Sequence, residues 1–229
     1  CLMVLFGFSQ RTYRGYCHWT AAQALATVGL ALHLLRDSHP DLLPLANLLM
    51  LQWPVLLLAG LRRFYQRSGM ALPAAFDWAL LVGCYLVWLT TWVAQADLVW
   101  RIAAFSFAAG TLLLYTATLL ARLDDFATSA GLKTLTVALG VSCAMHAWRL
   151  LQGVLLPQDP QSTQHLLLAG AAIVVALSLV MVYLALLLTY ERTQHDLGES
   201  QRQLRELANM DMLTQVPNRR HFHELATRS

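Results

Sequence analysis

Charged side chains are scarce in this chain of 229 residues. Lys, Arg, Asp and Glu make up only 13% of it, whereas hydrophobic residues make up 57%. Soluble globular domains carry about 25% charged residues, so the composition excludes an ordinary soluble domain and predicts a multi-pass membrane protein. The net charge of +3 is small and its arginines are dispersed between apolar runs. We therefore expect no nucleic-acid partner.

Paired cysteines are also lacking. The four cysteines, Cys1, Cys17, Cys84 and Cys143, form no CxxC pair and no metal-ligand spacing. We interpret them as small apolar packing residues and expect no metal site in this chain. No signal-peptide pattern is present, and the apolar residues 1–8 are interpreted as the end of a truncated first span.

Six apolar runs are long enough to cross a bilayer as helices. A hydrocarbon core of roughly 30 Å requires about 20 such residues at 1.5 Å each. The predicted fold is therefore an all-α membrane protein, a multi-span helical bundle in which Pro54 kinks the second complete span. The predicted spans are residues 19–35, 42–61, 76–94, 99–121, 135–156 and 166–188.

The cationic residues alternate between loops, which predicts the orientation. By the positive-inside rule, loops rich in Lys and Arg lie in the cytoplasm. This rule places the C-terminus in the cytoplasm as well. The loops concerned contain Arg11 and Arg14, then Arg62, Arg63 and Arg67, then Arg122 and Lys133, and finally Arg192.

Polar and aromatic residues converge on the outer half of this predicted bundle. Ionisable residues inside membranes usually face the bundle interior or a wet cavity, so the pattern predicts a sensor pocket for an anionic headgroup or metabolite. Alternatively, the tryptophans form an interfacial belt, the arginines reach toward the headgroups and His146 bonds a neighbouring helix. A haem held by His33 and His146 is a third interpretation. The candidate pocket residues are His33, Trp88, Trp92, Trp100, Arg101, His146 and Arg149.

No proline interrupts the chain between the last span and residue 210, so we predict one continuous helix from residue 166 to about residue 210. Leu197, Leu204 and Leu207 in this linker form a partial heptad pattern. The pattern is compatible with a solvated single helix or with a weak parallel dimeric coiled coil.

The ten residues from Asp211 to Arg220 resemble the N-terminal motif Asp-x-Leu-Thr-x-Leu-x-Asn-Arg-Arg of the GGDEF domain, the catalytic domain of bacterial diguanylate cyclases. Gln215 replaces the usual Gly and Val216 replaces Leu. Pro217 ends the preceding helix and Asn218 is a suitable N-cap for the next one. The matching residues are Asp211, Leu213, Thr214, Asn218, Arg219 and Arg220.

A second resemblance links the membrane region to bacterial GGDEF proteins. It consists of the pattern Arg-x-Tyr-x-Gly-x-x-x-Trp and the later Gly-Leu-Arg-Arg-Phe. No ligand is implied by it. The residues that carry it are Arg11, Tyr13, Gly15, Trp19 and residues 60–64.

These resemblances imply a domain order. Residues 1–189 would form a transmembrane sensor bundle in the bacterial inner membrane. Residues 190–210 would form a helical linker, and residues 211–229 the start of a cytoplasmic GGDEF domain. The family condenses two GTP into cyclic di-GMP with Mg²⁺ or Mn²⁺, which implies a homodimer that responds to a small-molecule or lipid signal. Because the GGDEF signature and metal carboxylates are absent from residues 211–229, we expect this chain alone to be inactive.

Two other functions remain open from the sequence. The GGDEF domain could be degenerate and only bind nucleotide or a partner, or be coupled to a phosphodiesterase domain. A transporter is a third reading, which the lack of internal repeats and the long C-terminal helix disfavour.

Overall fold

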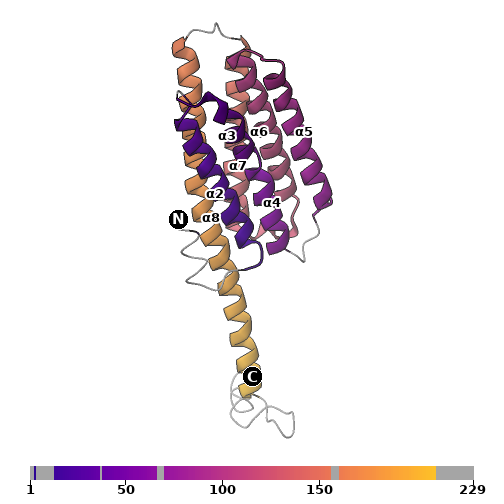
Figure 1. Cartoon of the computed structure of the whole chain (residues 1–229). Coiled ribbons are helices and arrows are strands. Elements are labelled where there is room, and N and C mark those ends of the chain that lie inside the picture. The colour runs from indigo at the N-terminus through magenta and orange to yellow at the C-terminus, as the bar shows by residue number, and fades with distance from the viewer. Residues whose placement is uncertain (1–2, 4–12, 37, 66–69, 156–159, 210–229) are drawn as a thin grey trace. The chain divides into compact units, whose positions relative to one another are not determined.

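The helical architecture is seen in the computed structural model, which describes residue 3 and residues 13–36, 38–65, 70–155 and 160–209. Every regular element in these ranges is a helix (Figure 1). Two short 3-10 turns, η1 (Pro40–Leu42) and η2 (Asp124–Ala127), accompany the α-helices. The α-helices are α2 (Tyr16–Leu34), α3 (Leu43–Leu51), α4 (Trp53–Phe64), α5 (Ala74–Val93), α6 (Leu98–Leu120), α7 (Ala130–Leu155) and α8 (Pro160–Asn209).

The described residues include five helices that are long and apolar enough to cross a membrane. They are Pro40–Phe64, Ala74–Val93, Leu98–Leu120, Ala130–Leu155 and the apolar part of α8. These five match five of the six predicted spans. The sixth, residues 19–35, is indeed helical as α2, but two histidines and Gln23 make it less apolar than the others. Residues 1–2 and 4–8, predicted as part of a truncated span, lie outside the described residues.

Proline divides the second predicted span into two helices. The chain leaves α3 at Leu51 and starts α4 at Trp53, with Gln52 between them. Pro54 occupies the second position of α4, where a missing backbone N–H costs no helical hydrogen bond. The kink predicted at Pro54 is therefore observed as a break at Gln52, two residues before it.

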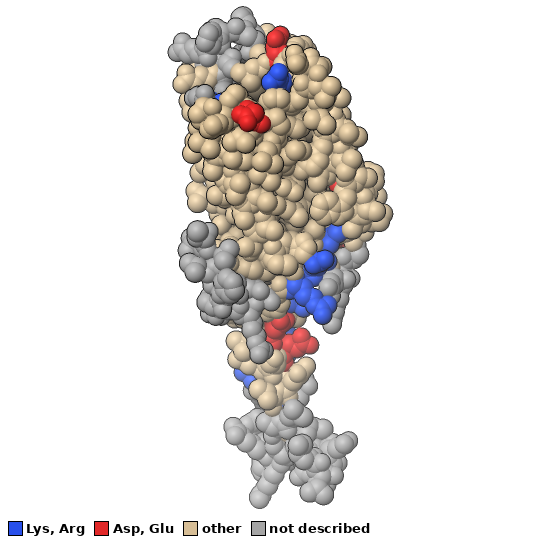
Figure 2. All heavy atoms as spheres, viewed as in Figure 1, with Lys and Arg blue, Asp and Glu red and all other residues tan. Residues whose placement is uncertain are grey.

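The centre of the bundle is α6, the most buried of the five long apolar helices. Both α5 and α7 pack along it, and α2 packs against α3 and α4 (Figure 1). Trp88 is fully buried between α5, α6 and the α3–α4 segment, in a cluster with Leu51, Leu81 and Leu112. The face drawn in Figure 2 is mostly uncharged in the middle of the bundle, and its charged side chains lie toward the ends, as a lipid environment requires.

The two halves of the membrane-region pattern contact each other where α2 begins and α4 ends. Gly15 has a positive φ of 103°, and an added Cβ there would collide with the carbonyl group of Gly60. The Trp19 indole N–H donates to the carbonyl oxygen of Leu57 at 3.2 Å. The Phe64 ring lies 5.4 Å from the Trp19 ring. The glycines and aromatic residues of this pattern thus allow α2 and α4 to pack closely in this chain.

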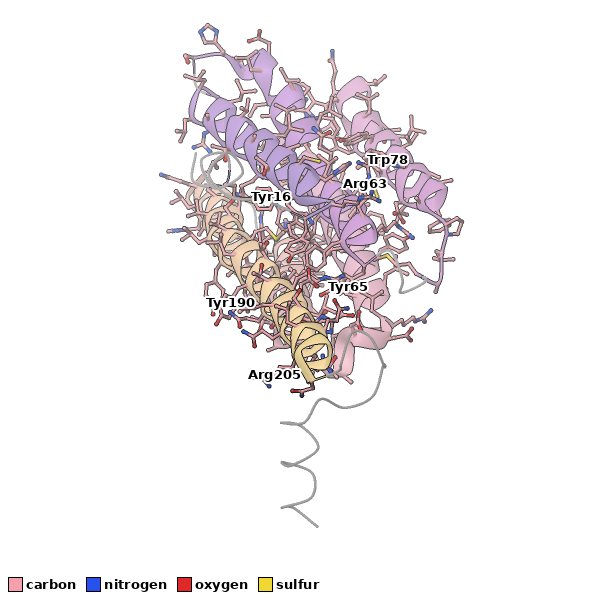
Figure 3. The ribbon with its side chains drawn as sticks, turned by 90° about the horizontal axis from the view of Figure 1, so that it is seen from below. Tyr16, Arg63, Tyr65, Trp78, Tyr190 and Arg205 are labelled. Atoms are coloured by element: carbon pink, nitrogen blue, oxygen red, sulfur yellow. The ribbon has the colours of Figure 1, made fainter. Side chains whose placement is uncertain are left out.

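A buried ion pair lies at this same end of the bundle, which is viewed in Figure 3 with Arg63 and Trp78 as landmarks. Arg62, in the last turn of α4, donates from Nε to Oδ2 of Asp77 at 2.7 Å and from Nη2 to Oδ1 at 2.9 Å. The hydroxyl of Tyr115 donates to the same carboxylate at 2.6 Å. We call Arg62, Asp77 and Tyr115 the ion-pair cluster. It joins α4, α5 and α6.

The last helix confirms the prediction of an unbroken segment. It runs from Pro160 to Asn209 over 50 residues, or roughly 75 Å at 1.5 Å per residue. It starts six residues before the predicted residue 166, because proline is well suited to the first turn of a helix. By internal contacts the chain divides within this helix into two compact units, Cys1–Leu186 and Leu187–Ser229.

Candidate functional site

A cavity of about 890 Å³ lies within the first unit, at the end of the bundle opposite the ion-pair cluster. Residues from α2, α3, α4, α5, α6, α7 and the first part of α8 line it. The lining includes five of the seven residues that the sequence analysis proposed for a sensor pocket. These five residues are His33, Trp92, Arg101, His146 and Arg149.

Arg149 points into the bundle and not toward the headgroups. Only 6% of the residue is exposed, although it lies two turns from the end of α7. Its guanidinium packs against Gly170 of α8, where an added Cβ would lie 2.7 Å from Nη1 and 2.8 Å from Cζ. Gly170 therefore provides the space that the guanidinium occupies. This geometry disagrees with the alternative in which Arg149 reaches outward along lipid.

His146 lies one turn before Arg149, on the same face of α7, as the spacing of three residues predicts. It is 4% exposed, and its ring lies 6.3 Å from the ring of Phe105 on α6. In the described part of the chain, neither Nδ1 of His146 nor Nε of Arg149 has a hydrogen-bond partner. Two buried polar groups on one helix face are thus left with unused hydrogen-bonding capacity.

His33 approaches the cavity from α2 and is held by a neighbour. Its Nε2 lies 3.0 Å from Oδ1 of Asn47 on α3. This hydrogen bond orients the imidazole and occupies the nitrogen that a haem iron would need. The geometry therefore gives no support to a haem between His33 and His146.

Arg101 is fixed by two contacts near the start of α6. Its Nε donates to the carbonyl oxygen of Ala96 at 2.7 Å, and its guanidinium carbon lies 4.2 Å above the Trp92 ring. The first contact closes the tight turn after α5, in which Gln95 has a positive φ of 49°. The second is a cation–π interaction. Arg101 therefore has a structural task in addition to lining the cavity.

The other two predicted pocket residues lie elsewhere. Trp88 is fully buried in the apolar cluster around Leu112 and is not part of the cavity lining. Trp100 is 57% exposed on the outside of α6, where it fits the alternative of an interfacial tryptophan. The neighbouring Arg101 faces inward because consecutive helical residues are turned by about 100°.

The charged residues among the described lining of the cavity are all cationic. Three arginines line it, Arg36, Arg101 and Arg149, and the described residues that form the lining include no Asp or Glu. Burying a guanidinium without a counter-charge is unfavourable in a low-dielectric interior. The remaining lining is largely aliphatic and aromatic, including Leu113, Phe105 and Leu177. Such a site is chemically suited to a ligand with a negative group and an apolar body.

The predicted linker and GGDEF residues lie in the second unit. Leu197 and Leu204 are 50% and 65% exposed on α8. The side chain of Leu207 and the whole motif, Asp211, Leu213, Thr214, Asn218, Arg219 and Arg220, lie outside the described residues. An ion pair of Arg192 with Asp196 at 3.4 Å supports the helix in this region.

Sequence reasoning missed the ion-pair cluster and part of the cavity. Asp77 is the signal that could have indicated the cluster, because an acidic residue within a predicted span requires a cationic partner. Asn47 and Gly170 gave no comparable signal, since their roles depend on contacts between distant helices. In the described residues, no group of three or more His, Cys, Asp and Glu side chains could hold a metal ion.

Comparison of the chain with protein-family models, with curated proteins and with solved structures finds no match.

Proposed function

We propose that this chain is the membrane signal-sensing and transmitting region of a bacterial diguanylate cyclase, which condenses two GTP into cyclic di-GMP. The observation that carries the proposal is the continuity of α8 from the cavity to the linker. Gly170 and Ala171 in its first part line the cavity, and the same unbroken helix continues to Asn209, directly before the residues that resemble the GGDEF motif. A conformational change at the cavity could therefore be transmitted along α8 toward that motif.

The exposed leucines of α8 support a dimeric mechanism. Leu197 and Leu204 are seven residues apart, so they share one face of the helix, and both are at least half exposed in the single chain. A second α8 packed against this face would cover them as a short parallel coiled coil. The proposed enzyme needs two GGDEF domains, each with GTP and Mg²⁺ or Mn²⁺, to face each other. A ligand that favours one of two linker arrangements by a few kcal/mol would change their populations strongly.

The second candidate is a receptor whose GGDEF domain binds nucleotide or a partner without turnover, because residues 211–229 do not contain the GGDEF signature or the metal carboxylates that turnover needs. The protein encoded by the complete reading frame distinguishes the two. It is incubated with GTP and Mg²⁺, and cyclic di-GMP is measured by mass spectrometry, with the 229-residue chain as the negative control. If the complete protein makes cyclic di-GMP and the 229-residue chain does not, the result supports the cyclase. Bound GTP without product supports the receptor, and neither product nor bound GTP contradicts the GGDEF assignment.

The proposed orientation places the ion-pair end of the bundle and the C-terminus in the cytoplasm. It is tested by labelling single cysteines introduced in intact cells. A cysteine at Asp124 should be protected from a membrane-impermeant maleimide, whereas a cysteine at Asp97 should react. The opposite pattern would reverse the topology.

A further inference from the structure

We propose that the cavity binds an anionic amphiphile, with its negative headgroup on Arg149 and His146 and its alkyl tail in the apolar part of the bundle. This inference rests on the proposed function, because it names the ligand class of the same cavity. It concerns binding by the first unit, however, and its test needs no cyclase activity.

The headgroup site follows from the unused donors. Arg149 is 6% exposed and His146 is 4% exposed, so both are too deeply buried for bulk water to solvate them freely. Nε of Arg149 and Nδ1 of His146 lack partners in the described chain, and no described carboxylate lines the cavity. A carboxylate or a phosphate matches the planar donor fork of a guanidinium, and it supplies the missing counter-charge.

The tail site follows from the direction of the lining. Along α8, the lining runs from Gln164 to Ser178, and the part from Gly170, beside the Arg149 guanidinium, to Ser178 is roughly 12 Å long at 1.5 Å per residue. Val174 and Leu177 line that stretch. Leu113 lines the cavity from α6. A ligand with its charge at Arg149 therefore meets apolar side chains along the rest of its length.

The size of the cavity favours a small amphiphile. Its volume of about 890 Å³ lies within the range of about 300–1,000 Å³ that is typical of small-molecule sites. The other cations, Arg36 and Arg101, lie nearer the helix ends and increase the positive potential around the headgroup position without being as deeply buried. A neutral or cationic amphiphile of the same length lacks the interaction that this arrangement provides.

Three probes with the same tail test the charge requirement. The 229-residue chain in phosphatidylcholine nanodiscs is titrated with decanoate, decanol and decylamine, and binding is measured by calorimetry and by the shift in unfolding temperature, with empty nanodiscs as the control. We expect saturable binding of decanoate, at least about tenfold weaker binding of decanol, and no binding of decylamine. Equal affinity for decanoate and decanol, or no saturable binding of decanoate, would overturn the proposal.

Variants at the headgroup position test the assigned residues. Arg149→Gln should weaken decanoate binding by about 10- to 100-fold, because a charge-assisted hydrogen bond is lost. Gly170→Ala adds a Cβ within 3 Å of the guanidinium, whose flexible end can shift, so a smaller loss is expected with the fold intact. The matched control is Arg63→Gln, an exposed arginine in the last turn of α4, which should leave binding unchanged. Unchanged decanoate affinity in both Arg149→Gln and Gly170→Ala contradicts the assignment, and the alanine variant decides if the glutamine variant does not fold.

Lipid composition identifies the source of the ligand. Nanodiscs that contain phosphatidylglycerol present an anionic headgroup from the bilayer itself. If this headgroup occupies the cavity, decanoate affinity falls in those nanodiscs and does not fall in the Arg149→Gln variant. If the natural ligand is a free single-chain acid, decanoate affinity is the same in both lipids. Either result supports an anionic amphiphile. If decanoate affinity falls equally in the wild type and in Arg149→Gln, the effect arises at the membrane surface and gives no support to the site.

The binding proposal and the proposed signalling function can be contradicted independently of each other. Decanoate bound by the chain without any change in cyclic di-GMP from the complete protein would contradict the sensor function and keep the binding site. If the complete protein makes cyclic di-GMP but the 229-residue chain does not bind decanoate, the cyclase function is supported and the proposed ligand class is wrong.

Discussion

The two ends of the bundle each contain an inward-facing arginine, and the two arginines differ in their hydrogen-bond partners. At one end, Arg62 makes two hydrogen bonds to Asp77, at 2.7 and 2.9 Å, and Tyr115 donates a third to that carboxylate at 2.6 Å. At the other end, Arg149 is more deeply buried than Arg62, yet its Nε has no partner among the described residues and it lines a cavity. The less buried arginine therefore has the more complete set of partners. A completed network joins helices, whereas an incomplete one is available to a ligand.

This difference has an energetic consequence. Removing one partner of a buried ion pair leaves an uncompensated charge and strongly destabilises a protein. A buried charge without a partner already has an uncompensated desolvation cost, so its replacement by an apolar side chain should be neutral or favourable. The ion-pair cluster and the cavity therefore predict changes in stability of opposite sign. Four predictions test this contrast, with each effect measured as a change in the free energy of unfolding in neutral detergent.

The largest effect is expected from Asp77→Asn. The amide keeps the size of the side chain but leaves the Arg62 guanidinium without a counter-charge. We expect a loss of about 2–4 kcal/mol, somewhat below the value for fully enclosed pairs because 16% of the Arg62 side chain is exposed. Denaturant unfolding followed by helical circular dichroism measures it. An unchanged midpoint would show that the pair does not hold α4 and α5 together.

The next effect contrasts the two glycines, one at each end. A Cβ at Gly60 would lie 2.2 Å from the Trp19 indole nitrogen and 3.0 Å from the carbonyl oxygen of Gly15, groups fixed between two helices. Gly60→Ala should therefore cost about 1–3 kcal/mol by overpacking. Gly170→Ala meets only the flexible end of Arg149 and should cost much less. Thermal unfolding of both variants provides the comparison, and equal losses would contradict it.

A smaller effect is expected from Tyr115→Phe, which removes one donor from the Asp77 carboxylate and leaves the two bonds from Arg62. Hydrogen bonds to charged groups contribute about 1.5–3 kcal/mol, and we expect the lower part of that range because the ion pair itself remains. A double-mutant cycle with Asp77→Asn measures the coupling. Additive losses would show that the tyrosine acts independently of the carboxylate.

The sequence predicted much of the scaffold and only part of the cavity, for identifiable reasons. Apolar length and the absence of proline predicted the long helices and the continuity of α8. The spacing of His146 and Arg149 predicted a shared face. Trp88 and Trp92 are one turn apart and look equivalent in sequence, yet only the packing of α6 against α5 places Trp88 in the core and Trp92 at the cavity.

Long-range pairing was the part that local patterns could not predict. Arg62 was interpreted as a loop cation that reports orientation, and its partner Asp77 lies 15 residues away on the next helix. The space that Gly170 leaves for Arg149 depends in the same way on how α7 packs against α8. The resemblance to the GGDEF motif rests on the sequence alone, because its residues lie outside the described ones. That part of the interpretation stays a prediction.

The last and smallest effect is expected from Arg149→Met in the absence of added anionic amphiphile. Methionine fills a similar volume with an unbranched apolar side chain and removes a charge that has no described counter-ion. We expect no loss of stability and a gain of up to about 1 kcal/mol, opposite in sign to Asp77→Asn. The measurement is denaturant unfolding after extensive exchange into neutral detergent, with Arg63→Met at the exposed end of α4 as the control. A loss as large as that of Asp77→Asn would mean that Arg149 is a structural cation like Arg62, and that the two ends of the bundle do not differ. A neutral or stabilised variant would mean that an arginine is kept in the cavity at no benefit to the fold, which is expected of a residue that binds a ligand.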